Sequence, residues 1–384
     1  MAVINEVLAP SVVTKIVSRI YRPGNYLSRF FGMEIGGGNV DRISGRSYSW
    51  DIFDNVRGIP TARAPATGPD TIAANPVGRQ TNTFPRSYEK LPVNYELLAN
   101  IRTLGKNASE RDRMGATYLE KQGQVVKQRA DNFREFMVAS VLTVGTASFQ
   151  ISGDRWIPVT SLGSNPGWTI DYLVPSGNKS TAIPGLSPTS EFTNIIDAAW
   201  SVASTDIPAH LDKIDLAYQE LVGGPLSLIV TDSRVWNHVL NNTKMQAQGG
   251  SVNSVFAEFE RTELKNPDGS LMGIYVARLR ARPWLQWLII NTGLDVGQTP
   301  AYTRWYDGTK ATFFADGWQR GGYWQMQEGS EPVKENPQAP AIEQFGAHFW
   351  LREWDEPARV ELHGLQNCVP ELTIPKAIMI PKVA

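Results

Sequence analysis

The sequence predicts an α+β protein in which helices and strands follow one another in mixed order, without an internal repeat. Two observations carry this prediction. Apolar residues recur at helical spacing over residues 109–144, and short extended runs with alternating apolar and polar residues dominate the second half of the chain. A third observation is a long segment rich in proline and glycine between two expected strands, which is unusual inside a compact domain.

The composition excludes several classes of protein. The chain has 384 residues, and its 37 Lys and Arg against 38 Asp and Glu give a formal net charge of −1. This balance argues against a protein whose main task is to hold nucleic acid. The single cysteine, Cys368, excludes an intrachain disulfide and a thiolate metal cluster. We expect no secretory signal and no membrane-spanning helix, because no apolar run approaches about 18 residues.

The proline- and glycine-rich segment is the most unusual part of the chain. Strands are expected at residues 43–54 and 84–97, and the 57–80 segment between them contains four prolines and three glycines. Its only larger aliphatic residues are Ile59, Ile72 and Val77. Such a segment buries too little to offset its loss of conformational entropy. We therefore expect an extended hairpin whose tip is ordered, if at all, by another molecule.

Arginine is concentrated in the same region. Residues 42–90 contain one lysine, Lys90, and six arginines: Arg42, Arg46, Arg57, Arg63, Arg79 and Arg86. Arginine is enriched at protein interfaces, where its guanidinium pairs with carboxylates. We predict that these arginines, with the three aliphatic residues of the tip, contact another subunit. The alternative is a chance fluctuation in composition, and interspersed aspartates disfavour a nucleic-acid role.

Helices are expected at several positions, among them the following three and one that Ser233 begins, with Trp236, Val239 and Leu240. The first covers 109–144, begins at Ser109 with Asp112 in a capping-box arrangement, and ends before Gly145. Two more are expected after residue 190. Apolar residues from Phe192 to Trp200 indicate one of them, and those from Leu211 to Leu221 indicate the other.

No motif for catalysis, a metal or a cofactor is present, so we predict a protein that is not an enzyme. Phosphate-binding loops, nucleophile elbows and zinc motifs are missing, and the four histidines are widely separated. Cys368 is expected to be a buried apolar side chain. The 12 tryptophans, among them Trp284 and Trp324, and the acids Glu353, Asp355 and Glu356 leave open a carbohydrate-active reading. Tryptophans in the core or at interfaces are the favoured explanation.

Several short segments carry a resemblance to one family. They are Phe30-Phe31, Arg86–Pro92, Arg129–Gly145, Ser227–Leu240 with Trp236, Glu356–Arg359 and Lys376–Val383. In order and pattern the chain resembles the major capsid proteins of tailed double-stranded DNA phages, and more narrowly the lambda-type capsid protein E family. The resemblance extends over nearly the whole chain, although residues 149–186 align poorly.

The resemblance implies the tailed-phage major capsid fold, with an arm, an extended loop, a spine helix, a peripheral domain and an axial domain. The expected divisions are an arm at 1–42, an extended loop at 43–97 with its tip at 57–80, a peripheral domain at 98–189 with the spine helix at 109–144, a mainly axial domain at 190–335, and returning C-terminal strands at 336–384.

The implied function is structural. Copies of the chain would form pentamers and hexamers of an icosahedral head around double-stranded DNA, assembled in the host cytoplasm and located in the virion. A scaffolding protein and a portal are expected partners, and a decoration protein is possible. The alternatives are a cellular nanocompartment shell of the same fold and a secreted carbohydrate-active β-rich protein.

Overall fold

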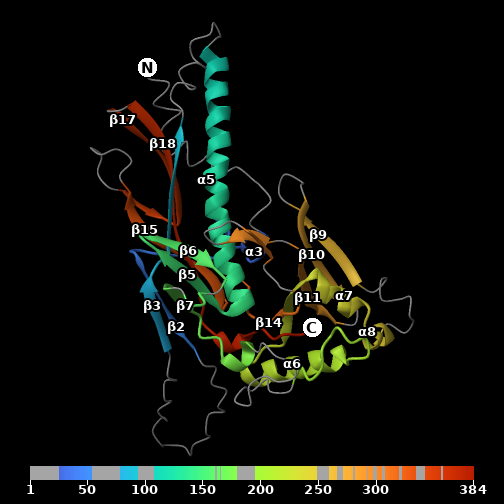
Figure 1. Ribbon diagram of the computed structural model, residues 1–384. Coiled ribbons are helices and arrows are strands. Elements are labelled where there is room, and N and C mark those ends of the chain that lie inside the picture. The colour runs from blue at the N-terminus through green and yellow to red at the C-terminus, as the bar shows by residue number, and fades with distance from the viewer. Residues whose placement is uncertain are drawn as a thin grey trace, which may run out of the picture.

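The computed structural model describes residues 26–53, 78–93, 108–160, 162–164, 166–179, 195–248, 259–265, 271–279, 282–291, 293–296, 301–304, 308–319, 322–333, 342–355 and 358–384. Figure 1 shows one long helix standing beside a long sheet, with a hairpin below them and a second sheet with its helices to the other side. Within the described part, no helix is both long and apolar enough to cross a bilayer.

The long helix is α5, Ala108–Val144, compared with the expected range of 109–144. It continues through the two glycines that could have interrupted it, Gly115 and Gly123. Its last turns are almost wholly buried, from Phe136 to Leu142 with Ser140 as the exception. Gly145 ends the helix at φ +73°, a left-handed conformation that glycine adopts without strain, and its N–H donates to the Val141 carbonyl at 3.0 Å.

The long sheet is organised around β18, Ala358–Leu372. The first half of β18 pairs antiparallel with β17 (Ala347–Asp355) on one side and β4 (Arg86–Val93) on the other, and its last residues pair with β15 (Trp324–Val333). β15 in turn pairs in parallel with β1 (Val40–Ile43) and antiparallel with β16 (Ile342–Phe345). Helix α5 packs against β18 and β4, so the helix and the long sheet form one unit.

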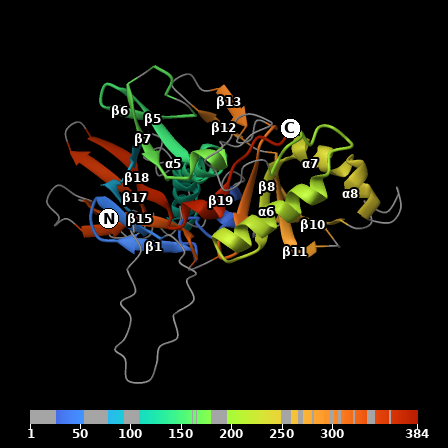
Figure 2. The same cartoon turned by 90° about the horizontal axis from the view of Figure 1, so that it is seen from below.

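The second sheet has the strand order β19-β14-β8-β11-β10-β9. Its strands are β8 (Leu226–Asp232), β9 (Phe259–Lys265), β10 (Leu271–Leu279), β11 (Arg282–Ile290), β14 (Ala311–Ala315) and β19 (Ile378–Met379). The helices beside it are α6 (Ile207–Leu221), α7 (Ser233–Leu240) and α8 (Thr243–Gln248). Figure 2 shows α6 crossing the sheet near β8, against which it packs.

The remaining elements are small. A three-stranded sheet follows α5 in the order β6-β5-β7. Its strands are β5 (Thr146–Ser152), β6 (Arg155–Val159) and β7 (Gly167–Asp171). A second hairpin pairs β12 (Gly293–Val296) with β13 (Ala301–Arg304). Short 3₁₀ helices lie at η1 (Ser176–Lys179) and η2 (Pro375–Ala377).

The expected hairpin is present, but its return strand is not where the sequence placed it. β2 (Ser47–Ile52) pairs antiparallel with β3 (Gly78–Thr83), whereas the expected return strand was 84–97. Residues from Arg86 onward instead form β4, which joins the long sheet. The polar sequence of β3, which buries none of its side chains, gave no apolar signal for a strand.

One expected helix is wrong. Residues 195–206 form turns, and the first helix of this region is α6, which begins at Ile207. The apolar residues that suggested a helix are buried, with Ile195, Ile196 and Trp200 at most 6 % exposed. They belong to an irregular segment that lies on the core. Hydrophobic spacing alone does not distinguish such a segment from a helical turn, which is why a helix was expected here.

The described chain begins at α3 (Tyr26–Phe30), which is fixed to α5 by one carboxylate. Glu135 on α5 accepts hydrogen bonds from the Leu27 N–H at 2.7 Å, the Ser28 N–H at 3.0 Å and the Ser28 hydroxyl at 3.1 Å. Burial raises the pKa of Glu135 to about 7 in spite of these donors. The root of the N-terminal segment is thereby attached to the spine of the fold.

Candidate subunit-contact site

Four of the six predicted contact arginines lie in the described residues, around the base of the hairpin. Arg42 lies on β1, Arg46 precedes β2, Arg79 lies on β3 and Arg86 begins β4. All four side chains are between 49 % and 66 % exposed. The other five predicted contact residues lie outside the described residues: Arg57, Arg63, Ile59, Ile72 and Val77.

Three of these arginines converge on β15. Arg42 pairs with Glu328 at 3.6 Å, while Arg46 and Arg86 both pair with Glu331, at 3.0 and 2.9 Å. The two glutamates are 3 % and 5 % exposed, so the guanidiniums lie over buried carboxylates and still face solvent. Such an arginine neutralises a buried charge and keeps donors for a second partner.

Arg79 is placed differently. It pairs with Asp51 across the hairpin at 3.6 Å, and both side chains are more than half exposed. Exposed pairs of this kind contribute about 0–1 kcal/mol, so Arg79 is not needed for the fold. The structure therefore brings three of the predicted arginines together and leaves the fourth out on the hairpin.

Sequence reasoning missed the acidic side of this site. Glu328 also pairs with Arg134 on α5, a guanidinium with no exposed surface that donates to the Met33 carbonyl at 2.6 Å. The missing signal was the length of β15. The apolar pattern at Tyr323–Gln327 predicts a strand that stops just before both glutamates, whereas β15 continues to Val333. Charged residues inside a strand are rarely buried unless they are paired. The arginines seen as an excess in the sequence are the partners of these two glutamates.

The base of the hairpin is held by aromatic packing. Tyr48, Trp50 and Phe84 are at most 4 % exposed, and Trp50 stacks on Tyr172 with ring centres 6.2 Å apart. Gly329 of β15 leaves room for Phe84, because a Cβ at that position would lie 2.5 Å from the Phe84 ring. The base of the hairpin, formed by β2 and β3, is therefore fixed against the body of the protein (Figure 1).

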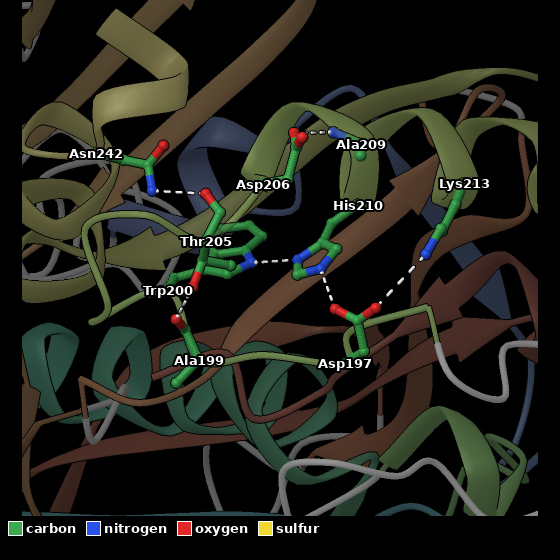
Figure 3. Close-up of polar contacts among 9 residues, drawn as sticks. All are labelled: Asp197, Ala199, Trp200, Thr205, Asp206, Ala209, His210, Lys213 and Asn242. Atoms are coloured by element: carbon green, nitrogen blue, oxygen red, sulfur yellow. Dashed lines mark hydrogen bonds and ion pairs between the residues drawn. The ribbon is translucent and has the colours of Figure 1, made fainter.

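The histidine closest to a catalytic arrangement is His210, drawn in Figure 3. Its Nδ1 accepts a hydrogen bond from the Trp200 indole N–H at 3.1 Å, which places the ring proton on Nε2, 2.7 Å from Asp197 Oδ1. The hydrogen bond from His210 lowers the pKa of Asp197, and Lys213 lies 3.7 Å from its other oxygen. Both ring nitrogens thus form hydrogen bonds within the fold. This arrangement indicates that His210 stabilises the structure.

The same network fixes the irregular segment that replaces the expected helix. Thr205 donates to the Ala199 carbonyl at 2.6 Å, and Asn242 donates to the Thr205 carbonyl at 2.9 Å. Asp206 caps α6 by accepting from the Ala209 N–H at 3.1 Å (Figure 3). In these turns, side chains donate hydrogen bonds to backbone carbonyls. In a helix, backbone N–H groups of the same segment would make these bonds.

Replacing His210 with leucine is expected to lower the free energy of unfolding by about 1–3 kcal/mol, because the fully buried Trp200 N–H would lose its acceptor. Glutamine at the same position offers both an acceptor and a donor, so His210→Gln is expected to lose less. Urea unfolding followed by circular dichroism measures both variants. Equal losses in the two would contradict the assigned role.

The remaining candidates for chemistry lie inside the protein. Cys368 has no exposed surface, and burial raises the pKa of its thiol to about 11, as expected for an apolar filler. His348 and His363 are 6 % and 3 % exposed, and each stacks on Trp350. Among the described residues, no group of three or more potential ligands could hold a metal ion.

Of the two tryptophans named for the carbohydrate-active alternative, Trp324 is not accessible to a sugar. Trp324 is fully buried and contacts Phe31 edge to face, which makes it a core residue. Trp284 is 59 % exposed and lines a pocket. The side chains of Glu353 and Asp355, and the whole of Glu356, lie outside what the structure describes.

Comparison with solved structures identifies the fold. A prophage capsid protein of Escherichia coli CFT073 superimposes with a TM-score of 0.51 at 12 % identity, over 98 % of this chain and 99 % of that one. A phage-related protein of Bordetella bronchiseptica RB50 gives 0.49 at 8 % identity over 97 % of each chain. An encapsulin of Synechococcus elongatus PCC 7942 gives 0.35 at 8 % identity, over 90 % of this chain and 85 % of that one.

Sequence comparison adds nothing to this. No protein-family model matches the chain, and no curated protein matches it. The narrower lambda-type assignment therefore stays a prediction. At 12 % identity the structural similarity concerns the backbone alone, and it extends over nearly all of both chains. The expected fold class is confirmed: this chain has the fold of a tailed-phage capsid protein.

Proposed function

We propose that this chain is the structural subunit of a tailed-phage head, which assembles into pentamers and hexamers around double-stranded DNA. The observation that carries the proposal is the capsid fold, shared with the prophage protein over 98 % of the chain. Because one fold can serve several functions, the site must support the proposal too. A cluster of half-exposed arginines beside a projecting hairpin is the kind of surface on which a shell subunit depends.

We propose that the contact is made by the predicted residues at the hairpin. Arg42, Arg46 and Arg86 each keep a half-exposed guanidinium while neutralising a glutamate of β15. A carboxylate on a neighbouring copy can share these donors without leaving Glu328 or Glu331 unpaired. Arg57, Arg63 and the three aliphatic residues of the tip, Ile59, Ile72 and Val77, complete the proposed contact.

The divisions expected from the resemblance remain part of the proposal. They are the arm at 1–42, the extended loop at 43–97, the peripheral domain at 98–189, the mainly axial domain at 190–335 and the C-terminal strands at 336–384. Within the proposed loop, β4 pairs with β18 and so belongs to the long sheet. The part of the loop that projects would therefore be limited to the residues between β2 and β3.

Further partners are proposed on the same basis. A scaffolding protein and a portal would guide assembly in the host cytoplasm, and a decoration protein is possible on the finished virion. The formal charge of −1 suits a wall that encloses DNA without binding its sequence. No catalytic activity, cofactor or membrane contact is part of the proposal.

Deleting residues 58–76 is expected to abolish shell formation and leave a folded subunit. The deletion spares β2 and β3, whose paired residues are 47–52 and 78–83, and it removes three of the nine proposed contact residues, Ile59, Arg63 and Ile72. Electron microscopy of the full chain, alone and with a co-expressed candidate scaffold, should show shells for the parent and none for the deletion. Normal shells from the deletion variant would contradict the proposal.

Two controls make the result interpretable. Thermal unfolding should give the same transition for both proteins, since the hairpin base is packed by residues outside the deletion. Particles purified from cells that carry the source genome should contain DNA. A nuclease should digest this DNA only after the particles have been disrupted. Particles filled with an enzyme in place of DNA would instead assign the chain to a cellular nanocompartment.

A further inference from the structure

A half-exposed tyrosine of the long sheet has hydrogen-bond partners that the shell function does not use. Tyr88 lies on β4 and is 44 % exposed. Its hydroxyl oxygen lies 2.7 Å from Nδ1 of His363, and Nε2 of the same ring lies 3.2 Å from a carboxylate oxygen of Glu361. Both partners are buried on β18. Tyr88, His363 and Glu361 thus form a relay of a nucleophile, a base and a group that orients the base.

The tautomer of His363 follows from its two neighbours. Glu361 accepts a hydrogen bond from the Lys90 ammonium at 3.1 Å, and its second carboxylate oxygen faces Nε2 of the ring. A carboxylate can only accept, so the proton of the neutral imidazole is on Nε2. Nδ1 is then an acceptor, and the Tyr88 hydroxyl donates to it. The fold therefore directs the free electron pair of the ring at the proton of the tyrosine.

Burial keeps the two titrating groups of the relay in complementary forms. It raises the pKa of Tyr88, an effect that the neighbouring charge of Arg86 opposes, so the hydroxyl keeps its proton at neutral pH. Burial lowers the pKa of His363, so the ring is neutral there and can accept a proton. A protonated phenol is a weak nucleophile and needs such a base. Glu361 stabilises the imidazolium that forms when the proton moves.

The pair of His210 and Asp197 shows what the relay adds. That pair also combines an imidazole with a carboxylate, but Nδ1 of His210 accepts from the buried indole of Trp200, which is not a nucleophile. At His363 the corresponding nitrogen faces a half-exposed hydroxyl. The two histidines therefore differ in the one group that could react with a molecule from solution.

Two cations flank Tyr88 on the outer face of β4. Arg86, Tyr88 and Lys90 alternate with the residues between them and so share one face of the strand, while Glu89 on the other face pairs with Arg129 of α5. The Arg86 guanidinium lies 4.7 Å from the centre of the Tyr88 ring, and the Arg86 and Lys90 side chains are 49 % and 58 % exposed. Each is paired with a buried carboxylate and keeps further donors. An electrophile that reaches Tyr88 is therefore expected to carry an anion such as phosphate, which arginine and lysine both bind.

We propose that Tyr88 is a modification site that accepts the acyl group of an acyl phosphate. The Tyr88 oxygen attacks the acyl carbon while His363 takes the proton of the hydroxyl. The bond between the acyl carbon and the phosphate oxygen breaks, and the phosphate leaves with the electron pair and receives the proton from His363. The products are a tyrosine ester and inorganic phosphate. The modification does not depend on the proposed shell function, because all the reacting side chains belong to a single chain.

The pH dependence of acetylation by acetyl phosphate tests the relay in the full chain. A tyrosine that reacts through its phenolate becomes about tenfold more reactive with each pH unit up to its pKa of about 10. With His363 as the base, the rate at Tyr88 should instead be level from pH 7 to pH 9 and should fall as the pH drops below 6.5 and the ring takes a proton. Peptide mass spectrometry measures the rate at each residue. A tenfold rise per pH unit at Tyr88, or acetylation of Lys90 in place of Tyr88, would overturn the proposal.

Two variants complete the test. Trp156→Tyr places a tyrosine on β6 where the parent side chain is 46 % exposed and its aromatic neighbour is Trp168, and this tyrosine should show the phenolate dependence. His363→Gln keeps a hydrogen-bond acceptor that cannot take a proton, and it should slow acetylation of Tyr88 about 100-fold at pH 7. Thermal unfolding shows whether His363→Gln is folded, and the pH profile of the parent decides the question if it is not. An unchanged rate in folded His363→Gln would overturn the proposal.

Discussion

Replacing Arg134 with methionine is expected to lower the free energy of unfolding by about 3–5 kcal/mol. The Arg134 guanidinium has no exposed surface and pairs with Glu328, which is 3 % exposed. Among the residues that the structure describes, the Glu328 carboxylate would then keep one ion-pair partner, Arg42, at 3.6 Å and on the solvent side. A buried charge that loses its partner costs far more than the pair itself contributes.

A second variant separates the charge from the packing. In Arg134→Met with Glu328→Gln, position 328 no longer carries a buried charge without its partner, so at least half of the lost stability should return. Arg79→Met is the matched control, because its pair with Asp51 is exposed and its loss should cost less than 1 kcal/mol. Urea unfolding of the four proteins measures these differences. If Arg134→Met cost no more than Arg79→Met, the pair would not be what joins α5 to β15.

Acid is expected to destabilise the long sheet through its buried histidines. His348 stacks on Trp350 with ring centres 5.2 Å apart, and burial lowers the pKa of His348 to about 4. Burial also lowers the pKa of His363, which stacks on the same indole with ring centres 5.2 Å apart. The folded sheet therefore holds both rings in the neutral form.

The sign follows from the two pKa values of His348. Below its unfolded pKa of 6.5 the unfolded chain binds a proton that the folded sheet refuses until about pH 4. The stabilisation is complete above pH 6.5 and is lost as the pH falls toward 4, by about 3 kcal/mol. His363 acts in the same direction, although Glu361 at 3.2 Å favours its charged form.

The variant His348→Phe isolates this contribution. Phenylalanine keeps an aromatic ring against Trp350 and does not titrate, so the variant should lose less stability than the parent between pH 6.5 and 4. At pH 8 the histidine is neutral in both states, and any difference there measures the contacts of the uncharged ring. Glu135 acts with the opposite sign, because its raised pKa of about 7 adds stability as the pH falls, but both proteins contain it. Parallel stability curves would contradict the prediction.

Elements with a strong local pattern were predictable from the sequence. The helical stripe placed α5 to within one residue at its start, and the stop before Gly145 followed from the conformational freedom of glycine. Leu211, Ile214 and Tyr218 marked the buried face of α6 in the same way. In these cases one segment carries its own signal, since the side chains that specify it are a few residues apart.

Features that depend on distant partners were not predictable. β3 buries no side chain, and its partner strand β2 is the reason that it is a strand. The contact arginines were visible as an excess, but the acids that hold them lie on β15, more than 240 residues away. The turns at 195–206 present the apolar spacing of a helix, and the hydrogen bonds of Trp200 with His210 and of Thr205 with the Ala199 carbonyl show why they are not one.

The strand at the centre of the long sheet has a consequence for the timing of folding. β18 occupies residues 358–372 and supplies the partners of β4, β15 and β17, while β1 must wait for β15, 286 residues later. At about 5–20 residues per second, synthesis separates β1 from β15 by roughly 15–60 s. A nascent chain therefore cannot close its long sheet until β18 has been synthesised, and β1 and β4 are without their sheet partners for most of that time.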